Sequence, residues 1–309
     1  FPGHKFFSWS LSLSIAFPAY VYAFIFVGIF EYSSPLSEYL RSFDLYLPSI
    51  KNIYGASIIM SMALFPYIFL ITKAQLSSVG LNIFRAARSL GDSNIAAIRK
   101  VILPSLRPTI IAGMALVIFE TISDFGGVST LRIETFTVGI YDAWFGYQSY
   151  LTASKLAGFL LIFVFLIMFI SKNFGKERRN VAFKTAEIFE KIELKWFKQV
   201  IISCICLLIF IIIFCIPLLQ LLIWQLSDIN ISLLDNIKFL FNSLIIGFLA
   251  SILTVFIAIG LSLSYRGFAR LRFLISISSS GYAIPGSVVS AGLLIGFYTL
   301  FGSSITLYG

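Results

Sequence analysis

Long stretches without any charged side chain constrain the fold of this chain more than any other feature. They cover residues 6–30, 52–72, 156–171, 199–227, 239–265 and 273–309. Most of them exceed the roughly 20 residues that a helix needs to cross a lipid bilayer. Because backbone polar groups inside a bilayer must be paired within the protein, such stretches fold as helices. The sequence therefore predicts an all-α membrane protein, a multi-span transmembrane helix bundle with about seven spans.

The composition excludes a soluble globular domain. The chain has 309 residues, of which 59% are hydrophobic and 12% are charged. A soluble domain of this size carries about 25% charged residues. The net charge of +9 does not indicate nucleic acid as a partner, because the basic residues lie in short segments between apolar stretches.

Histidine and cysteine are too sparse or too badly spaced for a metal site or a disulfide framework. His4 is the only histidine, which excludes a histidine-based metal or catalytic cluster within the chain. Cys204, Cys206 and Cys215 lie in one apolar run without Cys-x-x-Cys spacing, and are interpreted as small packing residues.

The spans can be placed from the apolar intervals. They are expected at 9–30 (with Pro18 inside), 53–72 (with Pro66 inside), 109–124, 151–171, 200–225, 239–265 and 273–300. The glycine- and aromatic-rich segment 125–150 is expected to be a loop with partly re-entrant structure. Most of the 23 basic residues lie at Lys5 and in 73–107, 172–198 and 266–272, which share one side if there are seven spans. The positive-inside rule makes that side cytoplasmic.

The basic island 82–108 carries the signals of two short helices that meet at a bend. One apolar face is expected from the spacing of Ile83, Ala86, Ala87 and Leu90. Gly91 follows where a helix ends in a left-handed residue, and Asp92 or Ser93 is expected to cap the second helix. That helix has Ile95, Ile98 and Ile102 on one face and is expected to end at Pro104 and Pro108. An ordinary loop between spans is the alternative.

The island resembles the cytoplasmic loop of ABC importer permeases. The pattern of that loop is Glu-Ala-Ala, three residues, Gly, nine residues, then Ile-x-Leu-Pro. Its positions are matched here by Ala86, Ala87, Gly91, Val101, Leu103 and Pro104. Arg85 stands where the family usually has Glu, so a contact made by that Glu is not carried over. In the family the loop docks in a groove of the ATPase subunit, and the resemblance implies a coupling helix at about 85–98.

Glu120 and Asp124 are the acidic residues of the third predicted span. A carboxylate inside a span costs about 2.5–3.5 kcal/mol on insertion scales, so it usually faces a cavity or a partner. Four residues apart, the two acids are expected to share one helix face and to line a cation path. Alternatively, Asp124 marks the aqueous end of the span and Glu120 bonds a neighbouring helix.

The same region resembles the iron(III) subgroup of these permeases, in which Glu-Thr-x-x-Asp-Phe-Gly and Thr-Phe-Thr-x-Gly-Ile-Tyr-x-Ala-Trp recur. Both motifs occur here, beginning at Glu120 and Thr135, and the Pro-Ala-Tyr segment begins at Pro18. The resemblance implies a fused permease of two halves. The halves are 1–171, which lacks its first span, and 199–309, which is truncated before its own coupling loop; 172–198 is a cytoplasmic linker.

A weak internal repeat agrees with two halves. At an offset of 267 positions the matching pairs are Ala16/Ala283, Pro18/Pro285, Val21/Val288 and Phe30/Phe297.

The resemblance implies a permease subunit that imports iron(III) by alternating access in the bacterial cytoplasmic (inner) membrane. Its partners would be ABC ATPase subunits, a periplasmic or surface-anchored solute-binding protein and the lipid bilayer. The chain has no phosphate-binding loop, since Gly175-Lys176 is followed by Glu177, so it is expected to be no enzyme and to hold no cofactor, with ATP bound by the partner.

Alternatives to this function stay open. Thiamine, polyamine or sulfate are other substrates transported on the same scaffold. An ion-coupled secondary transporter would also show repeats and intramembrane acids, but would not need the island. A membrane-embedded enzyme would need a reactive cluster on the spans, and only Glu120 and Asp124 come near one.

Overall fold

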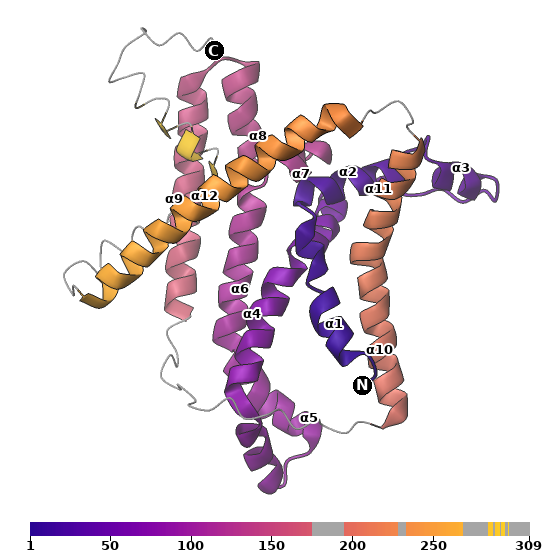
Figure 1. The fold of residues 1–309 in the computed structure, drawn as a ribbon, viewed down its shortest axis with the longest axis vertical. Coiled ribbons are helices and arrows are strands. Elements are labelled where there is room, and N and C mark those ends of the chain that lie inside the picture. Colours follow the sequence, from indigo (N-terminus) through magenta and orange to yellow (C-terminus); the bar gives the residue numbers. More distant parts are fainter. Residues whose placement is uncertain are drawn as a thin grey trace. The chain divides into compact units, whose positions relative to one another are not determined.

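The computed structural model describes residues 1–174, 195–227 and 233–267, together with a few residues between 284 and 296 (Figure 1). The chain forms two compact units. One contains residues 1–218 and the described residues from 284 onward, and the other contains the described part of 219–283. The candidate site lies in the first unit.

The regular elements of the described residues are helices. In chain order they are α1 (His4–Ser10), η1 (Leu13–Ala16), α2 (Ala19–Phe30), α3 (Pro35–Arg41), α4 (Ile53–Ser89), α5 (Asn94–Ala97), η2 (Ile98–Ile102), α6 (Leu103–Ser123), α7 (Gly126–Thr130), α8 (Phe136–Tyr141), η3 (Asp142–Gly146), α9 (Tyr150–Phe174), α10 (Trp196–Phe210), η4 (Ile211–Cys215), α11 (Ile216–Ser227) and α12 (Leu233–Gly267). The element η1 is a 3₁₀ turn, and η2, η3 and η4 are π-helical turns.

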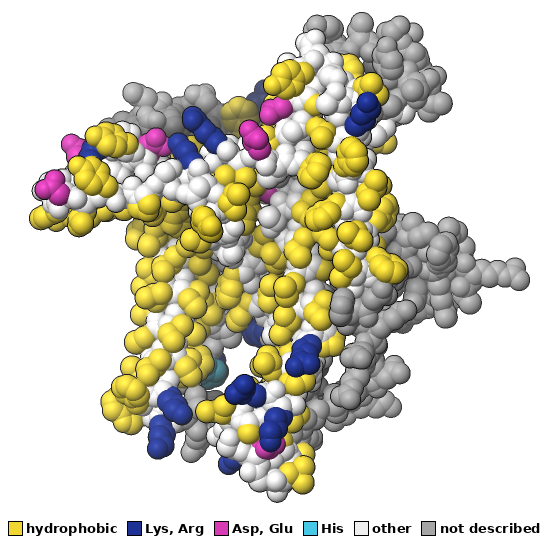
Figure 2. All heavy atoms as spheres, turned by 180° about the vertical axis from the view of Figure 1, so that it is seen from behind, with side chains coloured by type: hydrophobic (Ala, Val, Ile, Leu, Met, Phe, Trp, Pro, Cys, Tyr) yellow, Lys and Arg dark blue, Asp and Glu magenta, His cyan; other side chains and the backbone are white. Residues whose placement is uncertain are grey.

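The all-α membrane fold is confirmed. Within the described residues, six segments are long and apolar enough to cross a membrane: Ala19–Arg41, Ile53–Ser77, Asn94–Ser123, Tyr150–Ile170, Trp196–Ser227 and Ile237–Ser264. The seventh predicted span, 273–300, and most of the predicted linker 172–198 lie outside the described residues. Figure 2 shows hydrophobic side chains along the flanks of the helices, as expected for a surface that faces lipid.

The first predicted span is wrong in one respect, because Pro18 does not lie inside a continuous helix. Phe17 is extended (φ −100°, ψ 115°), and Pro18 is the N-cap of α2. A residue before proline is pushed out of the helical region by the proline ring, which explains the break. The chain therefore enters α2 through a short non-helical link after η1.

The predicted pair of short helices is also wrong. The first is the end of α4, a single helix of 37 residues that runs through Pro66 and the second predicted span. The second is the start of one apolar helical segment, Asn94–Ser123, which includes the third predicted span. The two long helices pack against each other as a helical hairpin in Figure 1, with α5 at its tip.

Pro104 and Pro108 do not end the second helix as predicted, because a π-helical turn precedes them. In η2 the Leu103 N–H donates to the Ile98 carbonyl, five residues back. The α-helix restarts at Leu103, so Pro104 falls in its first turn, where a backbone N–H has no helical partner to bond. Pro108 then lies inside α6, as neighbouring helices allow in a membrane.

Small residues let α4 and α6 approach closely. Gly113 of α6 is buried, and a Cβ atom placed there would lie 3.3 Å from Cγ1 of Ile68 on α4. A second contact region joins α2 to α4, with Tyr22, Ala23, Ile59 and Ala63 among its buried residues. These contacts fix the walls of the cavity described below.

Pro18 and Pro285, paired in the predicted repeat, have the same local geometry. The Pro18 carbonyl accepts hydrogen bonds from the N–H groups of Val21 and Tyr22, at 3.0 and 3.3 Å. The Pro285 carbonyl accepts from Val288 and Val289, at 3.0 and 3.2 Å. Each proline therefore starts a helix at the same repeat position, which agrees with the predicted offset. The division into two halves itself stays a prediction.

Candidate functional site

The tip of the hairpin turns at Gly91, as the sequence predicts. Gly91 has φ +93°, its N–H donates to the Arg88 carbonyl, and the Asp92 N–H donates to the Ala87 carbonyl. This pair of bonds is a Schellman motif, which pairs the last free carbonyls of a helix and needs a left-handed residue. The angle between α4 and α5 is therefore set at one residue.

Side-chain hydrogen bonds of residues near Gly91 stabilise this turn. Ser93, not Asp92, is the N-cap of α5, and its hydroxyl accepts a hydrogen bond from the Ala96 N–H at 3.2 Å. Asp92 instead accepts from Lys100 Nζ at 2.6 Å, while Arg88 donates to the Asp92 carbonyl at 2.8 Å. Because Lys100 is exposed, the ion pair contributes modestly to stability, and the turn depends mainly on backbone geometry.

On the two predicted apolar faces of the island, Ala87 is buried and Ile102 is half-buried, whereas Leu90, Ile95 and Ile98 are exposed; the side chain of Ile83 lies outside the described part of the chain. Leu90 is 88% exposed, Ile95 is 66% exposed and Ile98 is 46% exposed. Ala87, from the first predicted face, and Ala97 are buried at the tip, and their small side chains allow α4 and α5 to pack closely. The tip thus presents apolar side chains outward, with the exposed basic residues Arg85, Arg88, Arg99 and Lys100 around them.

The remaining residues of the predicted coupling motif lie on both sides of the turn at Gly91. Ala86 is exposed beside the buried Ala87 at the end of α4. Val101 lies in the π-helical turn η2, and Leu103 and Pro104 begin α6. The residues of the motif therefore lie in two places, around the turn at Gly91 and where η2 passes into α6.

A cavity of about 450 Å³ lies where the non-helical link before α2 meets α4 and α6. Its wall is made by Ile15, Phe17, Pro18, Ala19, Met60, Ala63, Leu64, Tyr67, Glu120, Ser123, Asp124 and Phe125. Both acids that the sequence singles out line this one cavity. Tyr67, a further polar residue of the wall, was not identified from the sequence. Its position four residues after Ala63, and so on the same face of α4, is the only sequence signal that places it there.

Glu120 and Asp124 do not share a helix face, which corrects the prediction. Glu120 lies on α6, but the helix ends at Ser123 and Asp124 has an extended backbone (φ −68°, ψ 133°). Its carboxylate accepts a hydrogen bond from the Val128 N–H at 2.9 Å and thereby caps α7, while its carbonyl accepts from the Thr137 hydroxyl at 2.7 Å. Burial raises the pKa of the Asp124 carboxyl, and the backbone N–H groups of Val128 and Gly127 lower it in part.

The segment 125–150, predicted to be a partly re-entrant loop, consists of short helices. The helices α7, α8 and η3 pack there against α2, α6 and α9. Gly126 and Gly127 approach their neighbours closely, since a Cβ at Gly127 would lie 2.7 Å from Met60 and 2.8 Å from the Asp124 carboxylate. These glycines let the segment close one end of the cavity.

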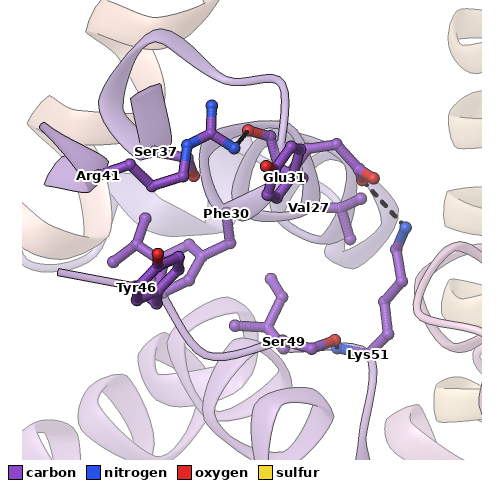
Figure 3. Close-up of a pocket in the computed structure, with 11 residues that line it drawn as sticks. Val27, Phe30, Glu31, Ser37, Arg41, Tyr46, Ser49 and Lys51 are labelled. Carbon is purple, nitrogen blue, oxygen red and sulfur yellow. Dashed lines mark hydrogen bonds and ion pairs between the residues drawn. The ribbon is translucent and has the colours of Figure 1, made fainter. Parts of the chain in front are cut away.

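A second pocket, of about 240 Å³, lies near the N-terminal end of α4, away from the hairpin tip (Figure 3). Lys51 Nζ lies 3.0 Å from Oε2 of Glu31 at its edge. The guanidinium of Arg41 lies 3.8 Å from the ring centroid of Tyr32 and donates to the Tyr32 carbonyl at 3.0 Å. Tyr32 and Tyr46 are 73% and 72% exposed, so this pocket presents mixed aromatic and charged groups to the outside.

Charge differs between the two ends of the first unit. Lys and Arg side chains gather at the end that holds α5 and the start of α10 (Figure 2). At the other end, α3 and the segments around it carry Glu31, Glu38 and Asp44 beside Arg41 and Lys51. Among the described residues, no group of three or more His, Cys, Asp and Glu side chains is placed to hold a metal ion.

Comparison with known proteins gives one family and several relatives. The family model of the binding-protein-dependent transport system inner membrane component matches residues 2–180. The Fe(3+)-transport system permease protein FbpB 2 of Haemophilus influenzae is 27% identical over 95% of this chain and 56% of its own length. The sulfate transport system permease protein CysT of Salmonella typhimurium is 29% identical over 41% of this chain and 46% of its own length.

A probable molybdenum ABC transporter permease protein of Haloferax volcanii is 26% identical over 33% of this chain and 38% of its own length. The chain spans about half the length of the first of these curated relatives. No solved structure matches it.

Proposed function

Because the chain belongs to the family of binding-protein-dependent transport system inner membrane components, we propose that it is part of an ATP-driven importer for iron(III). In this proposal it forms the membrane path, and a solute-binding protein delivers the substrate to its outer face. The observation that carries the substrate is the similarity to an Fe(3+)-transport permease along 95% of the chain.

The hairpin tip is proposed as the coupling element. A lever transmits motion only if its angle is fixed, and the Schellman turn at Gly91 fixes it. The exposed Leu90, Ile95 and Ile98 give a separate ATPase subunit an apolar surface to grip, and Arg85 adds charge beside it. ATP is then bound by that subunit, and this chain needs no cofactor of its own.

The cavity beside Glu120 is proposed as a section of the substrate path. Its acidic groups favour a cation over an oxyanion such as sulfate, because like charges repel strongly in a low-dielectric site. This argument separates the chain from its sulfate and molybdenum relatives, which match it only in part. Thiamine and polyamines are cations too and are the alternative substrates.

The end of the first unit that holds α3 is proposed as the docking face of the solute-binding protein. Tyrosine and arginine are enriched at the centres of protein interfaces, and here Tyr32, Arg41 and Tyr46 surround one exposed pocket. The basic hairpin tip then lies in the cytoplasm, as the positive-inside rule requires.

The test is transport by the full-length protein in proteoliposomes, with its ATPase and solute-binding protein supplied. We expect uptake of radioactive iron(III) that requires ATP inside and the binding protein outside, and that excess sulfate does not inhibit. Uptake driven by an ion gradient without the ATPase would contradict the proposal and favour a secondary transporter. ATP-driven uptake that thiamine or spermidine abolishes would assign a different substrate.

A further inference from the structure

Two irregular points of the backbone, far apart in the sequence, lie against each other in the first unit. One is the non-helical link at Phe17 and Pro18, and the other is the π-helical turn η4, which ends two residues before Pro217. The ring of Phe17 lies 5.6 Å from that of Phe214, measured between centroids, and the ring of Phe6 lies 5.4 Å from that of Phe210. The breaks are therefore packed against each other by aromatic side chains.

Pro217 leaves a gap in the hydrogen bonding of its helix. In a regular α-helix the N–H of residue 217 would donate to the carbonyl of Ile213, four residues back, but proline has no N–H. The hydroxyl of Tyr22 on α2 donates to this same carbonyl, with 2.6 Å between the oxygen atoms. Inside a membrane, where water is absent, a carbonyl freed in this way needs such a partner.

The ring of Tyr22 belongs to the buried contact region between α2 and α4, and its hydroxyl reaches the backbone of two other elements. Its side chain is fully buried, and its hydroxyl also lies 3.5 Å from the Ser14 carbonyl of η1. The tyrosine thus contacts the backbone on both sides of the meeting point. The link that it holds includes Ile15, Phe17, Pro18 and Ala19, which form one wall of the cavity that contains Glu120.

We propose that Tyr22 is a positioning residue that ties the cavity wall to the α10–α11 helix by supplying the hydrogen-bond donor that Pro217 lacks. Only the consequence for transport rests on the proposed function; the position of the wall does not. Only the first copy of the predicted repeat carries this tyrosine. At the offset of 267 positions Tyr22 corresponds to Val289, which has no hydroxyl to donate.

The test uses a thiol reporter in the cavity wall. Cys204, Cys206 and Cys215 are replaced by alanine in the full-length protein, and Ala19→Cys is added. The rate at which a small methanethiosulfonate modifies this thiol in membranes is compared between the parent, Tyr22→Phe, Pro217→Ala and the double variant. Tyr20→Phe is the matched control, since Tyr20 lies on the same helix and is 55% exposed.

We expect Tyr22→Phe to speed the modification by about a factor of ten, the equilibrium change that matches the loss of one buried hydrogen bond. Pro217→Ala restores a backbone N–H at 217, so the double variant returns to the parent rate, while Tyr20→Phe has no effect. An unchanged rate in Tyr22→Phe, or a faster rate that Pro217→Ala does not reverse, overturns the proposal.

Folding and transport give separate outcomes. If Tyr22→Phe alone fails to assemble, assembly of the double variant supports the tie, and failure of the double variant contradicts it. In the transport assay, Tyr22→Phe is expected to lose most substrate-stimulated ATPase, with recovery in the double variant. A parent protein that does not transport iron(III), but whose thiol rates follow the pattern above, would refute the proposed function and keep the tie.

Discussion

At the scale of single residues, Glu120 and Asp124 carry the same carboxyl group four positions apart but lie in different local structures. Both line the same cavity, but Asp124 lies just past the helix end and uses its carboxylate to cap α7. Glu120 lies in the last turn of α6, which ends at Ser123, and its side chain lines the cavity. We propose that Glu120 acts in the substrate path and that Asp124 acts mainly in the structure.

Substitution at the two acids should separate these roles. Glu120→Gln keeps the size of the side chain and removes its charge, so iron(III) uptake is expected to fall while assembly is retained. Asp124→Ala removes a helix cap and should lower stability by about 1 kcal/mol, whereas Asp124→Asn keeps an acceptor oxygen and should lower it less. Uptake assays and thermal unfolding in detergent measure both effects. Unchanged uptake in Glu120→Gln would instead favour a packing role for Glu120.

Gly91 allows the second residue-scale prediction. A Cβ at this position meets no atom within 4 Å, so the only penalty of a substitution is the φ of +93°. Gly91→Val should therefore insert in the membrane but lose substrate-stimulated ATPase in the reconstituted complex, because a β-branched residue disfavours that φ. Gly91→Asn is the control, since asparagine tolerates left-handed geometry, and it should keep most of the coupling. Normal stimulation in Gly91→Val would contradict the lever.

At the scale of elements, the second arm of the hairpin runs as one helical segment from α5 through η2 into α6, and it packs against α4. The π-helical turn puts Pro104 in a first turn, and Gly113 permits close contact with Ile68. Both features lie on the helices that connect the tip to the cavity lined by α4 and α6.

The close contact at Gly113 predicts a position-specific cost. Gly113→Leu should destabilise the protein by about 1–3 kcal/mol, because the added side chain overlaps Ile68. Gly158→Leu on α9 is the matched control, since a Cβ there meets nothing within 4 Å. The two variants are compared by thermal unfolding in the same detergent. Equal unfolding temperatures would show that α4 and α6 are not packed at Gly113.

At the scale of the whole molecule, the separation of charge between the two ends of the first unit predicts its orientation in the membrane. Basic residues gather around α5 and the start of α10, and acids lie around α3 (Figure 2). Cytoplasmic loops carry an excess of Lys and Arg, so we propose that the hairpin tip faces the cytoplasm.

Thiol labelling checks this orientation. In a full-length protein in which every native cysteine is replaced, Tyr46→Cys should react with a membrane-impermeant maleimide added outside the cell, and the solute-binding protein should slow that reaction. Leu90→Cys, at a side chain that is 88% exposed, should react only after the membrane is opened. Labelling of Leu90→Cys from outside would reverse the orientation and remove the coupling role of the tip.

The sequence by itself determined the membrane fold, the approximate places of most spans in the described residues and the turn at Gly91, but not where the first and third spans begin. These follow from local properties: runs of apolar residues long enough to span a bilayer, and a glycine where a helix must end in left-handed geometry. The family, too, was recognisable from the spacing of a few residues around Gly91 and Glu120, and the family model confirms it.

Only the tertiary structure decided what the prolines do. Pro18 separates two helices, Pro104 starts one, and Pro217 frees a carbonyl that Tyr22 satisfies across 191 positions of sequence. Local rules give the missing N–H of a proline but not the partner that replaces it, because that partner comes from a helix brought near by packing. For the same reason, whether Glu120 and Asp124 share a helix face depended on where α6 ends and not on their spacing.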